Sequence, residues 1–350
     1  ARKAAKQNLD NSALKAVASE MRSYVALAAA TNGIMKGESR EFAYAPTKDS
    51  YYVALGDSST TSQFASNAYG RKLVKELNLD NKKNYTNEGI AGLRINDLMY
   101  ILDETYETDA YGQAEFSGKA DRIRENLIAK IEKADLITVG FSNNTLLEIA
   151  IEQMIRAFGG KETYAVDWSR YLKEDMAVQV EAMMADIETT MAETTAGMSG
   201  SGINMANIGP AARAAIESYL YNYMGFYMDY QKTLNKITEI NPDAKVVLIG
   251  IPNAFDGTTI VMGEKELPLG EYMGMLTNLM NLQQKGYATM TGKATYVDAP
   301  DVEVTSAAYA GDIDMMTFVS QLMIKGIDTL APSTNGHTYI KDQIMAAMNV

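Results

Sequence analysis

The chain has 350 residues, of which 47% are hydrophobic, so it is long enough to bury a large core and its composition argues against disorder. Its formal net charge of −12 at pH 7 argues against binding to nucleic acid or to an anionic membrane surface. The lack of cysteine excludes disulfides, a thiol nucleophile and thiolate metal sites. The chain has a single histidine, His337, so a serine hydrolase mechanism must use that residue as its base or work without a histidine.

Residues 1–49 are predicted to form an N-terminal helical extension and linker. Apolar residues recur at helical spacing up to about residue 35, and a polar stretch with Pro46 follows. We see no signal peptide and no apolar run long enough to span a bilayer. Because the chain opens at Ala1 without a methionine, we consider a trimmed chain or a mature form whose targeting segment is gone. The compartment stays open, with a secreted or cell-surface location slightly favoured.

The most informative stretch is residues 51–60. Its apolar part predicts a short buried strand that stops at Gly56-Asp57-Ser58, and a helix is expected over 63–77. A strand, a tight glycine turn and a helix place Ser58 at the carboxyl end of a strand, where unpaired backbone N–H groups can hold an oxyanion. A serine hydroxyl in that place can attack a carbonyl. Taken alone, Gly-Asp-Ser is more often an ordinary turn.

Further strands alternate with helices along the chain. The later strands are expected near the start of 84–94 and at 134–141, 245–250 and 294–298. The helices between and after them are expected at 95–102, 119–133, 267–288 and from Ile340 to Met348. This alternation predicts a parallel sheet with helices on both faces, in one domain over 50–350. Ligands of such sheets bind beyond the carboxyl ends of the strands.

Residues from about 146 to 240 are predicted to form a long, mostly helical insertion, broken by a Gly/Ser/Asn-rich loop at 197–208. The insertion is rich in methionine and tyrosine. Methionines at helical spacing are usually core residues, but they also build adaptable apolar pockets. A helical cap of this kind over an active site could hold an acyl chain.

Three of these stretches resemble sequence blocks of the SGNH hydrolases, also called GDSL esterases and lipases. Residues 52–58 resemble the first block, which implies that Ser58 is the nucleophile. Residues 87–92 resemble the second block, which implies that the Gly92 amide helps to form the oxyanion hole together with the Ser58 amide.

The third block is similar to residues 134–147, and it implies that Asn144 is the oxyanion-hole asparagine. The chain departs from the family pattern here. Ser142 stands where the family has glycine, and Thr145 stands where it has aspartate. Asn143 is therefore a rival for the role, although helix capping is the simpler interpretation of that residue.

The fifth block has the pattern Asp-x-x-His-Pro, often followed by Gly-His, and residues 328–337 match it except at one position. Ala331 stands where the catalytic histidine belongs, after the orienting aspartate Asp328. His337 matches the second histidine, which is usually not catalytic. In this mechanism the imidazole takes the serine proton and later protonates the leaving group, and alanine does neither. Losing one triad member costs on the order of 10⁴–10⁶ in turnover.

Three interpretations of Ala331 stay open. We favour an inactive variant in which the histidine was replaced to trap a bound substrate, because every neighbour in the motif is intact. A natural pseudoenzyme that binds without cleaving comes second. In the third, His337 acts as the base, but Thr334 rather than an aspartate lies three residues before it, which favours a structural histidine.

The resemblance covers most of the chain from about residue 50 onward. It implies a flavodoxin-like α/β/α sandwich with a helical cap, and a serine hydrolase of an acyl ester that needs no metal or organic cofactor. The substrate would be a small-molecule, lipid or carbohydrate ester. The methionine-rich insertion weakly favours an ester with an apolar acyl group. An acyltransferase and a non-catalytic binding protein on the same fold are the alternatives.

Overall fold

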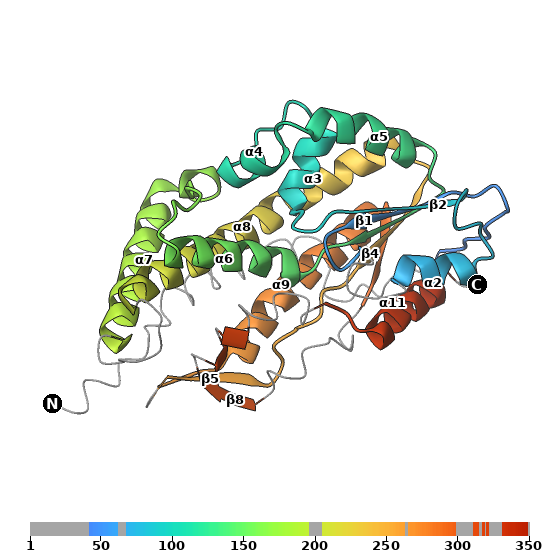
Figure 1. Ribbon diagram of the computed structural model, residues 1–350. Helices are drawn as coiled ribbons and strands as arrows, with labels where there is room; N and C mark the ends of the chain where they lie inside the picture. Colours follow the sequence, from blue (N-terminus) through green and yellow to red (C-terminus); the bar gives the residue numbers. More distant parts are fainter. Residues whose placement is uncertain are drawn as a thin grey trace.

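The fold is shown by a computed structural model (Figure 1). The structure describes residues 42–61, 68–195, 205–262, 265–298, 311–314, 317–318, 320–321 and 331–348. The predicted N-terminal helix, the aspartate Asp328 and most of the predicted loop at 197–208 lie outside the described residues. Among the described helices, none has both the length and the apolar character that a membrane span requires.

A five-stranded parallel sheet forms the centre of the molecule (Figure 1). Across the sheet, its strands are β2 (Tyr85–Gly89), β1 (Tyr52–Gly56), β3 (Leu136–Gly140), β4 (Lys245–Ile249) and β7 (Ala294–Val297). Every neighbouring pair is parallel. Counted along the chain these five strands lie in the order 2-1-3-4-5, which is the flavodoxin-like order. The predicted fold class, a three-layer α/β/α sandwich around a parallel sheet, is therefore confirmed.

The side chains of each strand alternate between two hydrophobic cores. In β1, Val53 and Leu55 belong to one core, and Tyr52 and Ala54 belong to the other. Successive residues of a strand point to opposite faces of the sheet, so helices must cover both faces to bury them. All five residues of β1 are buried, as expected for a strand between two helical layers.

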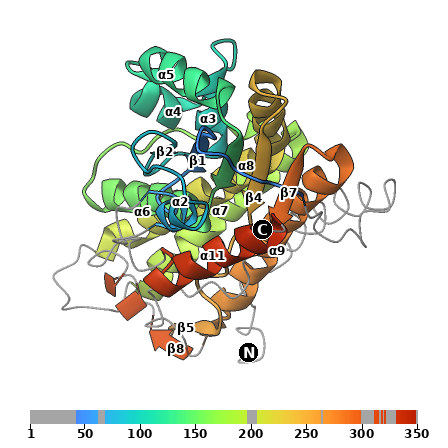
Figure 2. The ribbon, with the colours of Figure 1, turned by 90° about the vertical axis from the view of Figure 1, so that its right-hand side faces the viewer.

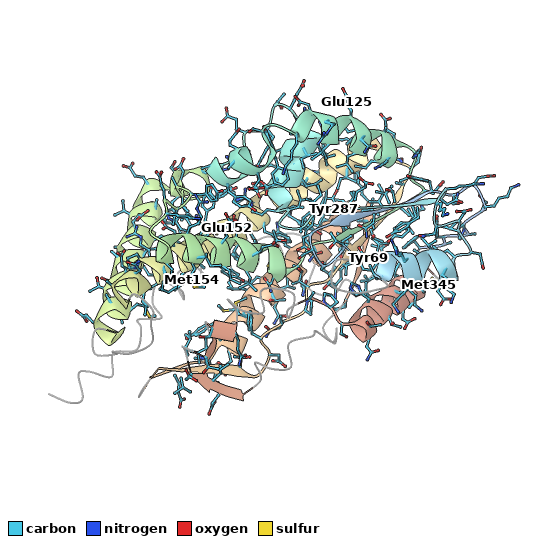
Figure 3. The ribbon with its side chains drawn as sticks, viewed as in Figure 1. Tyr69, Glu125, Glu152, Met154, Tyr287 and Met345 are labelled. Carbon is cyan, nitrogen blue, oxygen red and sulfur yellow. The ribbon has the colours of Figure 1, made fainter. Side chains whose placement is uncertain are left out.

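Two sets of helices provide those layers. Over the face of Val53 lie α3 (Ile95–Leu102), α4 (Ala110–Phe116), α5 (Ala120–Glu132), α8 (Ile208–Ile240) and α9 (Leu269–Thr291). Over the face of Tyr52 lie α2 (Tyr69–Glu76) and α11 (Thr334–Ala347). Figure 2 shows α2 and α11 side by side in front of the sheet, and Figure 3 labels Tyr69 and Met345 on them.

The predicted insertion corresponds to three long helices: α6 (Asn143–Phe158), α7 (Glu174–Thr195) and α8. Two short 3₁₀ turns, η2 (Trp168–Arg170) and η3 (Met205–Asn207), lie between them. Figure 1 shows α6 and α7 extending away from the sheet, whereas α8 has 33 residues and runs back to pack against α3 and α9.

Several elements were not predicted. A second sheet has the order β6 (Lys265–Leu267), β5 (Thr258–Met262), β8 (Gly311–Asp314), with β6 antiparallel and β8 parallel to β5. The sequence analysis also missed α4. The second sheet escaped notice because β6 and β8 have only three and four residues, too few to show a periodic pattern.

Strands β1 and β3 approach each other closely at a pair of glycines. Gly56 lies opposite Gly140, and a Cβ atom on Gly56 would stand 2.0 Å from the Gly140 carbonyl oxygen. The φ angle of Gly56 is +150°, which other residues rarely adopt. The glycine before Asp57-Ser58 is therefore required by the backbone packing.

We predict that Gly56→Ala lowers the free energy of unfolding by about 3 kcal/mol or more, because the methyl group adds both a clash and backbone strain. Denaturant unfolding measures this. Gly118→Ala is the matched control: a Cβ atom there meets no other atom within 4 Å, so we expect a change below about 0.5 kcal/mol. Equal effects of the two substitutions would contradict the prediction.

Candidate active site

Three of the predicted site residues, Ser58, Gly92 and Asn144, follow strands that end at one edge of the sheet. Gly56 of β1 pairs with Gly89 of β2 and with Gly140 of β3. Ser58 follows the first of these glycines by two residues, and Gly92 follows the second by three. The structure therefore brings the segments after β1, β2 and β3 together at the carboxyl ends of adjacent strands, where parallel sheets bind their ligands.

Ser58 lies in a buried turn directly after β1. The backbone N–H groups of Thr60 and Thr61 both donate to the Asp57 carbonyl, at 3.0 and 3.2 Å, and so close this turn. Residues 62–67 lie outside the described part of the chain, and the helix expected from residue 63 is described from Tyr69 onward.

The Ser58 hydroxyl is unusual for a buried polar group. The residue is only 3% exposed, and within the described residues its Oγ atom has no hydrogen-bond partner. Buried hydroxyls are almost always paired, because an unmet hydrogen bond costs about 1–3 kcal/mol. An orphan hydroxyl at the edge of a sheet is therefore a candidate for reaction with a bound ligand.

Two backbone N–H groups at this edge also have no acceptor. Within the described residues, neither the Ser58 amide nor the Gly92 amide donates a hydrogen bond. Gly92 is buried and has a left-handed φ of +73°, which favours glycine at that position. Backbone N–H groups without an acceptor, in the segments that follow neighbouring strands, are the kind of donor that an oxyanion hole requires.

The third block holds two neighbouring asparagines, Asn143 and Asn144. The helix α6 begins at Asn143, three residues before the expected start, so both asparagines lie in its first turn. The buried Asn143 side chain donates to the Thr277 hydroxyl at 2.7 Å and accepts from Tyr219 at 3.3 Å. Its amide is therefore occupied by contacts to α9 and α8 rather than by a helix cap. The side chain of Asn144 lies outside what the structure describes.

Asp57, between the two motif residues Gly56 and Ser58, joins the first and third blocks. One carboxylate oxygen accepts from the Ser59 N–H and hydroxyl, at 2.8 and 2.7 Å. The other accepts from the Ser142 N–H and hydroxyl, at 2.8 and 2.9 Å, and from the Thr145 hydroxyl at 2.5 Å.

The two residues that depart from the expected third-block pattern share one partner in this network. Ser142 and Thr145 each donate a hydroxyl hydrogen to the same oxygen of Asp57, which is completely buried. An aspartate at position 145 would instead place a second negative charge against that carboxylate. Burial raises the pKa of Asp57, while the bonds from Ser59, Thr145 and Ser142 oppose that rise.

Ala331 lies just before α11 and is 2% exposed. Its methyl side chain offers no group that accepts a proton. The neighbouring Pro332 lines a small cavity of about 20 Å³, between the ends of β3 and β4 and the turn at Ser59. That volume is enough for about one water molecule.

The contacts of His337 do not suit the role of a catalytic base. It is 2% exposed, its ring stacks on Tyr69 with centroids 6.1 Å apart, and its Nδ1 atom accepts from the Tyr69 backbone N–H at 3.3 Å. Burial, with a smaller contribution from Lys72, lowers its pKa to about 4. The imidazole is therefore neutral near pH 7, and the geometry supports a structural role.

Within the part of the chain that the structure describes, no group of three or more acidic or histidine side chains is arranged to hold a metal ion.

The sequence matches no protein-family model and no curated protein. Among solved structures, the chain is similar to a lipase from a goat rumen metagenome, at 15% identity and a TM-score of 0.40, over 85% of this chain and 97% of that one. It is similar to phospholipase A1 from Streptomyces albidoflavus at 13% identity and a TM-score of 0.40, over 86% and 98%. It is also similar to an acetyl-xylooligosaccharide esterase from Geobacillus at 14% identity and a TM-score of 0.40, over 88% and 97%.

We predict that Asp57→Asn lowers the free energy of unfolding by about 3 kcal/mol, because an amide NH₂ would face N–H donors on one side of the network. Asp135→Asn is the matched control. That aspartate is exposed and accepts one bond, from the Tyr51 N–H, which an asparagine oxygen can keep. Denaturant unfolding of both variants tests this, and a loss from Asp57→Asn no larger than from Asp135→Asn would refute it.

His337 predicts a pH dependence of stability. Its folded pKa of about 4 lies below the ordinary 6.5, so the unfolded chain binds the extra proton first. The free energy of unfolding should therefore fall as the pH drops from about 6.5 toward 4, by about 2–3 kcal/mol from this group.

His337→Asn keeps an acceptor for the Tyr69 amide and removes the titration. We expect its stability to fall less steeply over that pH range, as measured by denaturant unfolding at several pH values. Parallel curves for the two proteins would contradict the assignment.

Proposed function

We propose that this chain has the active-site framework of an SGNH-type ester hydrolase, with Ser58 as the nucleophile. The observation that carries the proposal is made on the described residues: the buried Ser58 hydroxyl has no hydrogen-bond partner there, and the backbone amides of Ser58 and Gly92 have no acceptor there. Such a set supplies both the attacking atom and the donors for the negative charge that develops on the carbonyl oxygen.

In the proposed reaction, the Ser58 oxygen attacks the ester carbonyl and a tetrahedral oxyanion forms. The amides of Ser58 and Gly92 hold that oxyanion, and the Asn144 side chain supplies a third donor. We assign this part to Asn144 rather than to Asn143, because the Asn143 amide already donates one hydrogen to Thr277 and its oxygen accepts from Tyr219, which fixes that side chain. Asp57 holds the turn after β1 against the start of α6, because it accepts hydrogen bonds from Ser59 and from Ser142.

The missing component is the base. In an active parent, Asp328 would orient a histidine at position 331, which would take the serine proton and pass it to the leaving alcohol. With alanine at 331, the proton has no acceptor in that place. We therefore propose that this chain binds an acyl ester and turns it over slowly or not at all.

Two alternatives use the same site. A non-catalytic binding protein would keep the bound ester intact, and the alanine at 331 favours it over an active enzyme. An acyltransferase would differ only in passing the acyl group to an alcohol instead of water. In each case the helical insertion at about 146–240 would act as a cap within the domain at 50–350 that carries the site.

We predict that Ala331→His raises the turnover of p-nitrophenyl acetate by about 10³-fold or more, because it restores the proton acceptor. Ala331→Phe is the matched control, since it adds a ring of similar size without a basic nitrogen. Thermal unfolding of both variants shows whether the buried position accepts a ring.

Adding Ser58→Ala to the histidine variant should abolish the gain. If folded Ala331→His and Ala331→Phe proteins are equally inert, the site has been adapted to binding. If the unchanged chain already hydrolyses the ester at the rate of the histidine variant, position 331 does not carry the base.

A further inference from the structure

The side chain of Asn87, in the second half of β2, joins the two segments that carry the proposed oxyanion donors. Its Nδ2 atom donates to the Thr60 carbonyl oxygen at 2.7 Å, and its Oδ1 atom accepts from the Gly89 backbone N–H at 2.9 Å. Thr60 lies two residues after Ser58, and Gly89 lies three residues before Gly92. One amide side chain therefore bridges the turn after β1 and the end of β2.

The two segments also meet closely at Gly89. A Cβ atom on this glycine would lie 3.0 Å from the Thr61 backbone nitrogen and 3.0 Å from the Asn87 Oδ1 atom. The Ile90 N–H donates to the Gly56 carbonyl oxygen at 3.0 Å, at the end of the paired strands. The Asn87 amide extends this contact from the strands onto the turn after β1.

The buried carboxylate of Asp57 serves a different junction. It accepts from Ser59 and from Ser142, so it ties the turn after β1 to the start of α6. The proposed oxyanion hole takes one backbone amide from the turn after β1 and one from the loop after β2. Its geometry therefore depends on contacts between these two segments, and the Asn87 amide supplies one.

A purely structural role for Asn87 would need only the bond to Gly89. An asparagine oxygen that accepts from the N–H two residues ahead forms a common local turn. The bond to Thr60 is of another kind, because it spans 27 residues of sequence and ends on a different strand connection. Only this second bond relates the positions of the two segments.

We propose that Asn87 is a positioning residue of the Ser58 site, which sets the separation between the backbone amides of Ser58 and Gly92. This inference rests on the proposed function of that site. Negative charge on the carbonyl oxygen develops only as the reaction proceeds, so a change in the separation of the amides should act on kcat and leave KM nearly unchanged. A misplacement of about 1 Å can cost on the order of 10² in rate.

The test compares Asn87→Ala with Asn84→Ala, each introduced into the Ala331→His protein. Asn84 is the matched control, because it directly precedes β2 and so lies at the opposite end of the same strand. Its Nδ2 atom donates to the carbonyl oxygens of Ser50 and Lys48, at 2.9 and 3.1 Å. Each substitution therefore removes an asparagine amide that donates to the backbone of a neighbouring segment.

We expect Asn87→Ala to lower kcat for p-nitrophenyl acetate by about 10- to 100-fold and to change KM by less than about 2-fold. Asn84→Ala should leave both constants unchanged. Denaturant unfolding should show a loss of stability in both proteins, so that a general loss of stability is separated from the effect on kcat.

The substitutions Asn87→Asp and Asn84→Asp form a second pair, which serves if alanine at position 87 prevents folding. At about pH 8, far above the ordinary pKa of aspartate, a carboxylate at position 87 keeps an acceptor for the Gly89 N–H but cannot donate to Thr60. Asn87→Asp should reproduce the loss of kcat, and Asn84→Asp should not.

The inference is overturned if the variants at positions 87 and 84 lose kcat equally, if those at position 87 change KM alone, or if they change neither constant. An Ala331→His protein that is inert contradicts the proposed function, and this inference falls with it. An active Ala331→His protein whose kcat does not respond to the substitution of Asn87 contradicts this inference alone.

Discussion

The buried carboxylate of Asp57 is the interaction on which the arrangement of the site depends. It accepts hydrogen bonds from Ser59 on one oxygen and from Ser142 and Thr145 on the other, and so ties the turn after β1 to the start of α6. A fully buried carboxylate is tolerated only when its oxygens are satisfied in this way. The tie fixes the turn that carries Ser58, and among the described residues the Ser58 hydroxyl itself has no hydrogen-bond partner.

Much of the fold could be predicted because its strands are short apolar runs that alternate with helices. The expected helix at 95–102 coincides with α3, and the buried run at 134–141 contains β3. Local patterns carry this information since each strand is buried on both faces. The small sheet of β5, β6 and β8 could not be predicted, because β6 and β8 are too short to show a periodic pattern and β8 pairs with β5, which lies far from it in the sequence.

The contacts within the candidate site could be predicted from the sequence less well than the fold. The motif order pointed to Ser58 and Gly92, but Ser142 and Thr145 could be read only as departures, because their shared partner Asp57 lies more than eighty residues away in sequence. The Asn143 amide is engaged by residues of α8 and α9, which no local pattern reveals.

The central claim is that Ser58 and the amides around it form an oxyanion-stabilising site, and a structure of the Ala331→His variant treated with a fluorophosphonate tests it most directly. The account predicts a single adduct with phosphorus on the Ser58 oxygen. The phosphonyl oxygen should lie about 2.7–3.1 Å from the backbone nitrogens of Ser58 and Gly92. An adduct on another residue, or a phosphonyl oxygen turned away from both amides, would contradict the account.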